Sequence, residues 1–153
     1  MPTALPFLPM MRELVRCYQA FEKYSAAHVR SLGLTPSQFD IVATLGNTPG
    51  MTFRELGEKT LITKGTLTGV VDRLERKRLV ERMPVAADGR CSIVRLTRAG
   101  QREFRRVFPD HLAHVGAALD RITPAQQEAL RRSLARLRIA LAEATDGAAP
   151  DEP

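Results

Sequence analysis

The sequence predicts a mainly α-helical protein with one small β-hairpin, built as a central lobe flanked by helices at both ends. Three observations carry this prediction. Apolar residues recur at helical spacing through most of the 153 residues, and threonine-based helix start signals recur along the chain. Between residues 79 and 96 the pattern changes to two short β-capable runs.

Threonine followed three residues later by glutamine or glutamate marks three helix starts. The segments Thr35-Pro36-Ser37-Gln38 and Thr123-Pro124-Ala125-Gln126 also have proline at the first helical position, and Thr52-Phe53-Arg54-Glu55 lacks it. A hydroxyl and a long polar side chain at this spacing satisfy amides that a helix start leaves free. Each of these segments precedes an apolar pattern of helical period, so each is predicted to begin a helix.

The first helix is predicted over about 7–31, a second from Thr35 to the turn cluster at 47–50, a short third from Phe53 to about Lys59, and a fourth over about 64–78. The apolar stripe of the first helix recurs at steps of four and three, like the seam of a coiled coil. Its members are Met10, Leu14, Cys17, Phe21, Tyr24 and His28. The fourth helix has an inner stripe of Leu67, Val70, Val71 and Leu74.

The runs 79–83 and 91–96, joined by a loop with Asp88-Gly89, predict the hairpin. A long helix follows from Thr97 to about Leu119, and Pro109 is expected to kink or interrupt it. The last helix carries leucines at 130, 134, 137 and 141, again at steps of four and three. The seams of the two terminal regions either pack on each other within one chain or form a dimer interface, which their heptad spacing favours.

Positive charge is concentrated in the middle third of the chain. Residues 54–106 hold 14 Lys or Arg against 7 Asp or Glu, a net of +7, and the rest holds 9 against 10, a net of −1. This distribution indicates either a solvated basic face or a surface for a polyanion such as nucleic acid. The proline-interrupted N-terminus lacks the basic start of a signal peptide, no run is long enough to span a bilayer, and two cysteines fit a reducing compartment, so we expect a cytoplasmic protein.

The outer face of the predicted helix over 64–78 is slim. Two glycines, Gly65 and Gly69, stand opposite the apolar stripe, and each costs about 1 kcal/mol relative to alanine inside a helix. Hydroxyl and basic side chains flank them. A short helix and a tight turn come before this helix, so the pair reads as a helix-turn-helix whose second helix suits the major groove of DNA, although glycine alone would favour a merely flexible surface helix.

The stretch from Leu34 to Gly100 closely resembles MarR-type transcriptional regulators, most specifically in ELGEKTLITKGTLTGVVDRLERKRLVER and in the later Asp88-Gly89-Arg90 of the hairpin, or wing. The resemblance implies that the helix over 64–78 enters the major groove, that Arg90 reaches the minor groove, and that Asp88 steadies the wing by pairing with Arg73. The DNA-binding residues so implied are Ser37, Thr63, Lys64, Gly65, Thr66, Thr68, Gly69, Arg73, Arg76, Asp88, Arg90 and Arg95. Arg78 departs from the family, which usually has glycine there.

The resemblance divides the chain into an N-terminal dimerisation helix (1–33), a winged helix-turn-helix DNA-binding lobe (34–100), C-terminal dimerisation helices (101–144) and a disordered tail (145–153). It implies a homodimer on a pseudo-palindromic duplex, usually a repressor, relieved by a small aromatic or anionic effector. The effector site is expected at Tyr24, His28 and Phe39. The alternatives are a thiol-based redox sensor and a winged-helix protein-interaction module without DNA binding.

Other candidate sites are weaker. Cys17 lies in an apolar seam and is expected to be buried, whereas Cys91 at the wing is expected to be exposed. His111 and His114 share one helical face, but no third metal ligand is evident, so we expect no metal and no other cofactor. The sequence has no phosphate loop, HExxH, CxxC or nucleophile elbow, and we expect no enzymatic activity.

Overall fold

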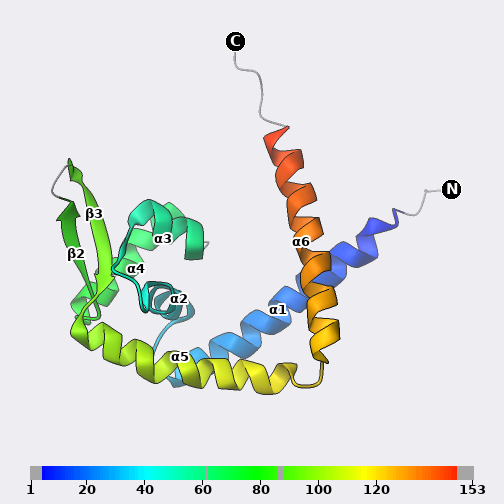
Figure 1. The fold of residues 1–153 in the computed structure, drawn as a ribbon, viewed down its shortest axis with the longest axis horizontal. Coiled ribbons are helices and arrows are strands. Elements are labelled where there is room, and N and C mark those ends of the chain that lie inside the picture. Colours follow the sequence, from blue (N-terminus) through cyan, green and yellow to red (C-terminus); the bar gives the residue numbers. More distant parts are fainter. Residues whose placement is uncertain (1–4, 61, 86–87, 148–153) are drawn as a thin grey trace, which may run out of the picture. The chain divides into compact units, whose positions relative to one another are not determined.

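The computed structural model describes residues 5–60, 62–85 and 88–147, with the backbone alone for residues 88–90. The chain divides into two compact units, residues 1–115 and 116–153, and each is treated by itself. The first contains α1 (Phe7–Ser31), α2 (Pro36–Leu45), β1 (Met51–Thr52), α3 (Phe53–Thr60), α4 (Lys64–Arg76), β2 (Val80–Val85), β3 (Asp88–Leu96) and most of α5 (Arg98–Leu119) (Figure 1). The end of α5 and α6 (Pro124–Asp146) make up the described part of the second.

The predicted start signals are confirmed as helix caps. The Thr35 hydroxyl accepts from the Gln38 amide while the Gln38 side chain accepts from the Thr35 amide, and Thr123 and Gln126 form the same reciprocal pair. The Glu55 carboxylate accepts from the Thr52 amide, 2.8 Å away. These bonds satisfy amides that have no partner inside the helix, so the sequence pattern located the first turns correctly.

The hairpin extends into a three-stranded antiparallel sheet of order β1-β3-β2. Val80 pairs with Leu96 in the register of β2 and β3, and the two-residue strand β1 adds Met51 opposite Val94. Strand β1 was not predicted, because two residues carry no readable alternation. All four of these side chains are buried, so one face of the sheet closes the core.

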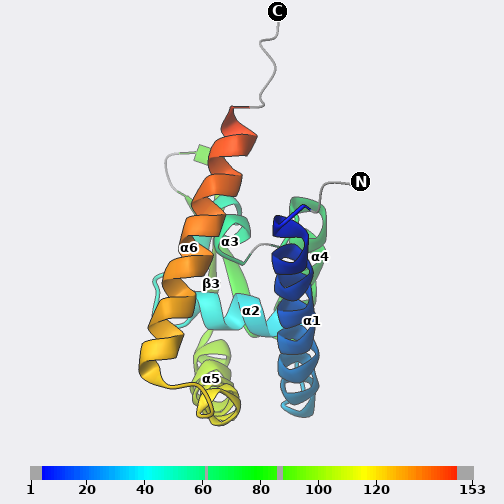
Figure 2. The same ribbon diagram turned by 90° about the vertical axis from the view of Figure 1, so that its right-hand side faces the viewer.

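Two buried clusters hold the first unit together. The larger joins the inner faces of α2, α3 and α4 to the sheet, with Ile41, Leu56, Leu74 and Val94 fully buried among its members. The smaller joins α1, α2 and α5 through Val29, Leu34, Phe39 and Val107. In Figure 2, a view nearly along the axis of α5, α1 and α2 are seen beside each other.

The long helix α5 begins directly against the root of the hairpin. The Thr97 amide donates to the Leu79 carbonyl at 3.0 Å, and the Thr97 hydroxyl accepts from the Gly100 amide at 3.0 Å. A Cβ on Gly100 would lie 1.9 Å from the Leu79 carbonyl oxygen. Only glycine therefore allows the first turn of α5 to pack this closely on the residue before β2.

The structure corrects three predicted boundaries. Helix α4 ends at Arg76, two residues early, because Arg78 has a φ of +59°. Pro109 lies inside α5 but does not interrupt it. Proline lacks an amide hydrogen, so the helix loses one backbone hydrogen bond there. The helix is held by Phe104, which packs in the larger core cluster, and by Val107, which packs in the smaller one. Helix α6 includes Thr145 and Asp146, which were assigned to a disordered tail, and residues 148–153 lie outside the described residues.

Helix α6 buries none of its residues in the single chain. Its leucines at 130, 134 and 141 are about half exposed, and most of the other exposed large apolar side chains lie on α1. Among residues 5–60, 62–85 and 88–147, none of the helices combines the length and the apolar character needed to cross a membrane.

Candidate nucleic-acid interface

Helix α4 has one buried and one exposed face, as its sequence predicts. The inner stripe of Leu67, Val70, Val71 and Leu74 is buried. The residues predicted for DNA contact lie on the exposed side, and a Cβ on Gly65 would meet nothing within 4 Å. Exposed on this side are Lys64, Gly65, Thr66, Thr68, Arg73 and Arg76, with Gly69 partly exposed.

The first turn of α4 has no side-chain cap. Thr63 occupies the N-cap position, but its hydroxyl donates to the Thr66 hydroxyl at 3.1 Å and does not accept from the helix amides. The starts of α2 and α6 are both capped by a threonine. Free amides at a helix start carry partial positive charge and bind phosphate oxygens well, so the exposed start of α4 can accept an anion from outside the chain.

Arg82 on β2, which the sequence analysis did not single out, ties the hairpin to α4. Its guanidinium donates to Asp72 at 2.6 Å and also to Glu75, both on α4, and it lies over the Phe53 ring, 5.3 Å from the centroid. The two acidic side chains of α4 thus share one cation, Arg82, within the lobe. Arg73 and Arg76 on α4 form no ion pair with another described side chain, so the exposed side of α4 is net positive.

Helix α4 stops in a left-handed turn at Arg78. The Arg78 amide donates to the Glu75 carbonyl at 2.8 Å and the Leu79 amide donates to the Leu74 carbonyl at 3.0 Å. This pair of bonds is the Schellman arrangement, which usually has glycine at the left-handed position. Arginine there costs about 1 kcal/mol, which confirms the strain anticipated at this departure from the family pattern.

The remaining predicted DNA-binding residues lie apart from α4. Ser37 is partly exposed on the first turn of α2. Arg95 on β3 is exposed and donates to Glu81 at 2.7 Å. The backbone of Asp88 and Arg90 forms the start of β3, but their side chains lie outside the described part of the chain, and so does the predicted pairing of Asp88 with Arg73.

The three predicted effector residues come together around two histidines of α5, and we call this group the imidazole cluster: Tyr24, His28, Phe39, His111 and His114. The His28 ring stacks on His114 with centroids 3.9 Å apart, and Tyr24 stacks on the other side of His114 at 4.3 Å. Phe39 meets His111 edge-on at 4.6 Å. The residues of α1 and α2 were predicted from the sequence as effector residues. The two histidines of α5 were not, because they lie more than 70 positions away along the chain.

His111 is the buried member of the imidazole cluster, with only 5% of its surface exposed. Its Nδ1 lies 3.1 Å from Nδ1 of His28, and its Nε2 lies 3.1 Å from the Ser25 hydroxyl. Burial and, after it, the neighbouring His28 and His114 lower the pKa of His111 below its ordinary value. The ring is therefore neutral near pH 7 and offers both a donor and an acceptor.

The chain is similar in sequence to known transcriptional regulators. A family model described as MarR family matches residues 32–90, the stretch from just before α2 into β3. The HTH-type transcriptional regulator MhqR of Bacillus subtilis (strain 168) is 27% identical over 124 residues, 81% of this chain and 86% of MhqR. The homoprotocatechuate degradative operon repressor of Escherichia coli is 33% identical over 93 residues, 61% of this chain and 63% of the repressor.

One solved structure of similar fold contains DNA. Sco3205, a MarR family transcriptional regulator from Streptomyces coelicolor, was solved in complex with DNA; it matches with a TM-score of 0.78 and 26% identity over 100% of this chain and 94% of that one. The chain belongs to the MarR family. The winged helix-turn-helix fold and the regulator class expected from the sequence are thus confirmed.

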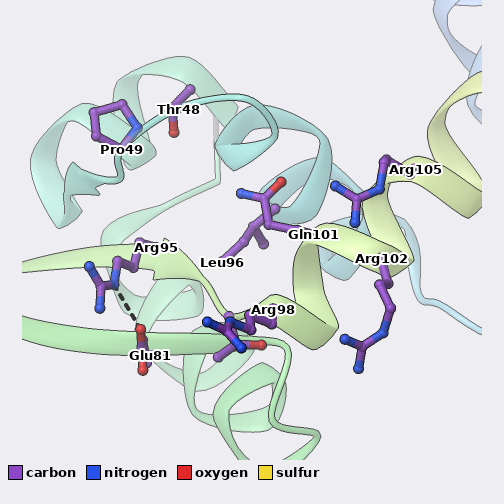
Figure 3. A pocket seen from close by; sticks show the side chains of 10 residues that line it. Thr48, Pro49, Glu81, Arg95, Leu96, Arg98, Gln101, Arg102 and Arg105 are labelled. Atoms are coloured by element: carbon purple, nitrogen blue, oxygen red, sulfur yellow. Dashed lines mark hydrogen bonds and ion pairs between the residues drawn. The ribbon is translucent and has the colours of Figure 1, made fainter.

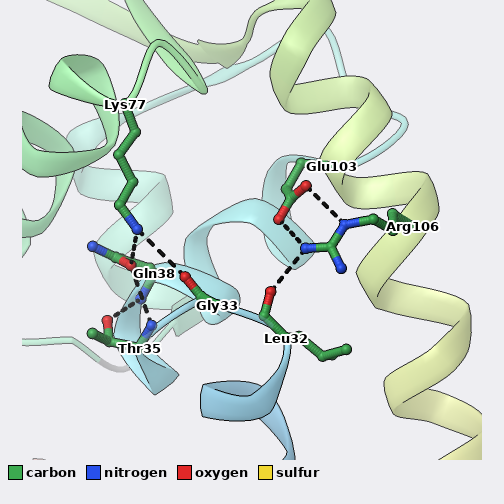
Figure 4. A network of polar contacts seen from close by, with 7 residues as sticks. All are labelled: Leu32, Gly33, Thr35, Gln38, Lys77, Glu103 and Arg106. Atoms are coloured by element: carbon green, nitrogen blue, oxygen red, sulfur yellow. Dashed lines mark hydrogen bonds and ion pairs between the residues drawn. The ribbon is translucent and has the colours of Figure 1, made fainter.

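In this MarR-family regulator, two basic side chains hold the turn between α1 and α2 from opposite sides (Figure 4). Lys77, at the end of α4, donates to the Gln38 side chain at 3.3 Å and to the Gly33 carbonyl at 3.5 Å. Arg106 on α5 donates to the Leu32 carbonyl at 2.8 Å and pairs with Glu103. The end of α4 is thereby linked to the turn that precedes Phe39.

The cysteines of this MarR-family chain differ from expectation at one position. Cys17 is exposed in the single chain, so the expectation of a buried thiol is wrong for the chain by itself; its apolar neighbours on α1 have no partner there to cover them. Cys91 is exposed, as predicted. Within the described ranges, no three His, Cys, Asp or Glu side chains are arranged to hold a metal ion.

Proposed function

We propose that this MarR-family regulator is a homodimeric repressor that inserts α4 into the major groove of a pseudo-palindromic operator and is released from it by a small-molecule effector. The observation that carries the proposal is the outer side of α4, which is exposed, narrow at Gly65, lined with hydroxyl groups and free of a side-chain cap at its start. Bases are read by short polar side chains in that groove, and phosphates are bound by free amides and cations.

Within this proposal, Thr66 and Thr68 contact base edges, while Thr63, Lys64 and the uncapped amides of α4 hold a phosphate. Ser37, Arg73 and Arg76 add contacts to the backbone, and Arg90 of the wing enters the minor groove, where a guanidinium is favoured. We omit Arg95 from this set because Glu81 holds its guanidinium at the base of the hairpin. The E. coli relative named above is a repressor, which supports the same sign of regulation here.

Dimerisation is supported by the apolar side chains that the single chain leaves uncovered. Helix α6 buries nothing, and Phe21 on α1 is 54% exposed in the midst of a heptad-like seam. A second copy would cover both helices and set two α4 helices about one turn of DNA apart. On this proposal the protein acts by binding and not as an enzyme, and it acts in the cytoplasm, where chromosomal DNA lies.

The effector site is proposed at the imidazole cluster. Aromatic faces of Tyr24, His28 and Phe39 and the neutral donor and acceptor atoms of the imidazoles suit a small aromatic compound with a polar or anionic substituent. The residues come from α1, α2 and α5, so a ligand that separates them would move α2 relative to α5. An effector that binds the DNA-incompetent form more tightly lowers DNA affinity by that difference in binding free energy.

The experiment is selection of operator fragments from genomic DNA with the purified full-length protein, followed by affinity measurements on the selected site. Arg90→Ala is expected to weaken binding to all sequences and to reduce the salt dependence. Thr66→Val is expected to change affinity by about 1–3 kcal/mol in a manner that depends on the base pair. Arg138→Ala on α6 serves as the charge-matched control, with no large effect expected.

Two results would reject the proposal. If no fragment is enriched and binding is weak and independent of sequence, the chain is not an operator-binding regulator. If peroxide releases the wild type from DNA but not a Cys17→Ser, Cys91→Ser double variant, the signal is oxidation of a thiol rather than an effector at the imidazole cluster. A screen of phenols and aromatic carboxylates, with His28→Phe as the site control, tests the effector directly.

A further inference from the structure

A hollow of about 760 Å³ lies between the loop from α2 to β1, the outer side of the hairpin base and the first turns of α5 (Figure 3). Thr48 borders it from the loop, and Glu81 and Arg95 border it from the strands. Arg98, Arg102 and Arg105 border it from α5. We call it the arginine hollow. All of these residues lie in the first unit, so the site belongs to one folded body.

The charges of the arginine hollow are not balanced within the described chain. Of the four guanidinium groups that line it, only that of Arg95 has a carboxylate partner, Glu81 at 2.7 Å. Arg98, Arg102 and Arg105 recur at steps of four and three on one side of α5 and form no ion pair with another described residue. Cations at such spacing repel one another on a helix surface.

Other arginines on α5 and α6 do form ion pairs with nearby glutamates. Arg106 is paired with Glu103 and donates to a backbone carbonyl. On α6, Arg131 and Arg132 share Glu128. The three guanidinium groups without an ion pair to a described residue are therefore all on the side of α5 that borders the hollow. This placement favours a binding site over a basic face that is only solvated.

The arginine hollow lies at the opposite end of β3 from the outer end of the hairpin. From Asp88, at the outer end of β3, seven residues lead to Arg95, which is about 23 Å along an extended strand. The wing therefore reaches DNA without these arginines. The volume, in contrast, lies within the range of about 300–1,000 Å³ that is usual for small-molecule sites.

We propose that the arginine hollow binds a small polyanion with at least two phosphate or carboxylate groups. Guanidinium groups bind both oxyanions through paired hydrogen bonds, and two or more anionic groups are needed to engage cations spread over two turns of α5. The Thr48 hydroxyl and the Gln101 amide border the same space and add neutral polar contacts. This site is separate from the imidazole cluster and does not depend on the proposed function in DNA binding.

The test is a calorimetric titration of the full-length protein with inorganic pyrophosphate at constant ionic strength, with citrate and acetate in parallel titrations. We expect saturable binding of pyrophosphate or citrate, the tighter of the two identifying the oxyanion, and none of acetate. An Arg102→Gln, Arg105→Gln double variant should bind about a hundredfold more weakly, about tenfold for each charged hydrogen-bonding group removed. An Arg136→Gln, Arg138→Gln variant loses the same charge on α6 and should bind like the wild type.

Saturable binding that the α5 double variant loses and the α6 variant keeps supports the site. Absence of saturation by both pyrophosphate and citrate, or equal affinity of the wild type and the α5 double variant, overturns it. A third arm measures affinity for operator duplexes with short and long flanks. If the α5 substitutions weaken only the long duplex and neither small anion saturates, these arginines serve DNA phosphates and the proposed small-anion site is wrong.

Discussion

The Nδ1 atoms of His28 on α1 and His111 on α5 lie 3.1 Å apart, so one ring donates and the other accepts, and the accepting ring must be neutral. This contact joins two helices that are far apart in the sequence. It also places the chain's three histidines in one group, because His114 stacks on His28.

The free energy of unfolding should fall as the pH is lowered through about 6.5. Burial lowers the pKa of His111 from its ordinary value of 6.5 in the folded protein. Between that lowered pKa and 6.5, the unfolded chain binds more protons than the folded chain, so acid favours unfolding. Urea denaturation from pH 8 to pH 5.5 measures this slope, and His111→Gln should flatten it. An unchanged slope in the variant would show that His111 does not carry the effect.

Loss of Arg82 should destabilise the lobe by about 1 kcal/mol, because it is a partly buried group that joins β2 to both Asp72 and Glu75 of α4. The substitution is Arg82→Gln, and the measurement is denaturant unfolding. Arg54→Gln is the control, since Arg54 pairs with Glu58 at the surface with 88% of its side chain exposed; we expect almost no change there. Equal effects of the two substitutions would remove the special role assigned to Arg82.

Gly65→Ala should lower operator affinity without lowering the stability of the fold. A Cβ at Gly65 meets nothing within 4 Å in the folded chain, and alanine favours a helix over glycine by up to about 1 kcal/mol. Thermal unfolding should therefore show an unchanged or higher midpoint, whereas operator affinity should fall because the added methyl group occupies space at the proposed DNA surface. Retention of full operator affinity would argue that this part of α4 does not approach DNA closely.

Arg78→Gly should raise the free energy of unfolding by up to about 1 kcal/mol. Arg78 has a φ of +59°, and this left-handed conformation costs a non-glycine residue about 1 kcal/mol. Part of the gain is lost because glycine has more conformational entropy in the unfolded chain. Arg76→Gly, within α4, should be destabilising by a similar amount. Urea denaturation should show that the free energy of unfolding rises in Arg78→Gly and falls in Arg76→Gly. A loss of stability in Arg78→Gly would contradict the prediction.

The features predicted well from the sequence are those fixed by neighbours along the chain. The caps at Thr35 and Thr123 and the buried stripe through Leu67 and Leu74 depend on residues within one or two helical turns. The features missed depend on residues that meet across the fold. Strand β1 exists because Met51 pairs with Val94, and Arg82 is important because its ion pairs reach back to α4.

The candidate sites divide in the same way. The exposed side of α4 follows from helical period, so its residues could be named in advance. Tyr24, His28 and Phe39 were also named, but the pattern of the last helices gave no reason to add His111, whose contacts come from α1 and α2. Cys17 was expected to be buried because it shares an apolar face of the first helix. The helical period shows which side chains share a face, but it does not show whether the same chain covers that face, and Cys17 is exposed.

The close contact between Gly100 and Leu79 gives α5 a mechanical role. Because the first turn of α5 rests on the carbonyl before β2, the two cannot shift separately without breaking the Thr97 bonds as well. His111 lies 11 residues farther along the same helix, about 16 Å at the rise of an α-helix. A displacement of α5 at the imidazole cluster is thus transmitted along a continuous helix to the hairpin root, and it requires no relay of side-chain rearrangements through the core.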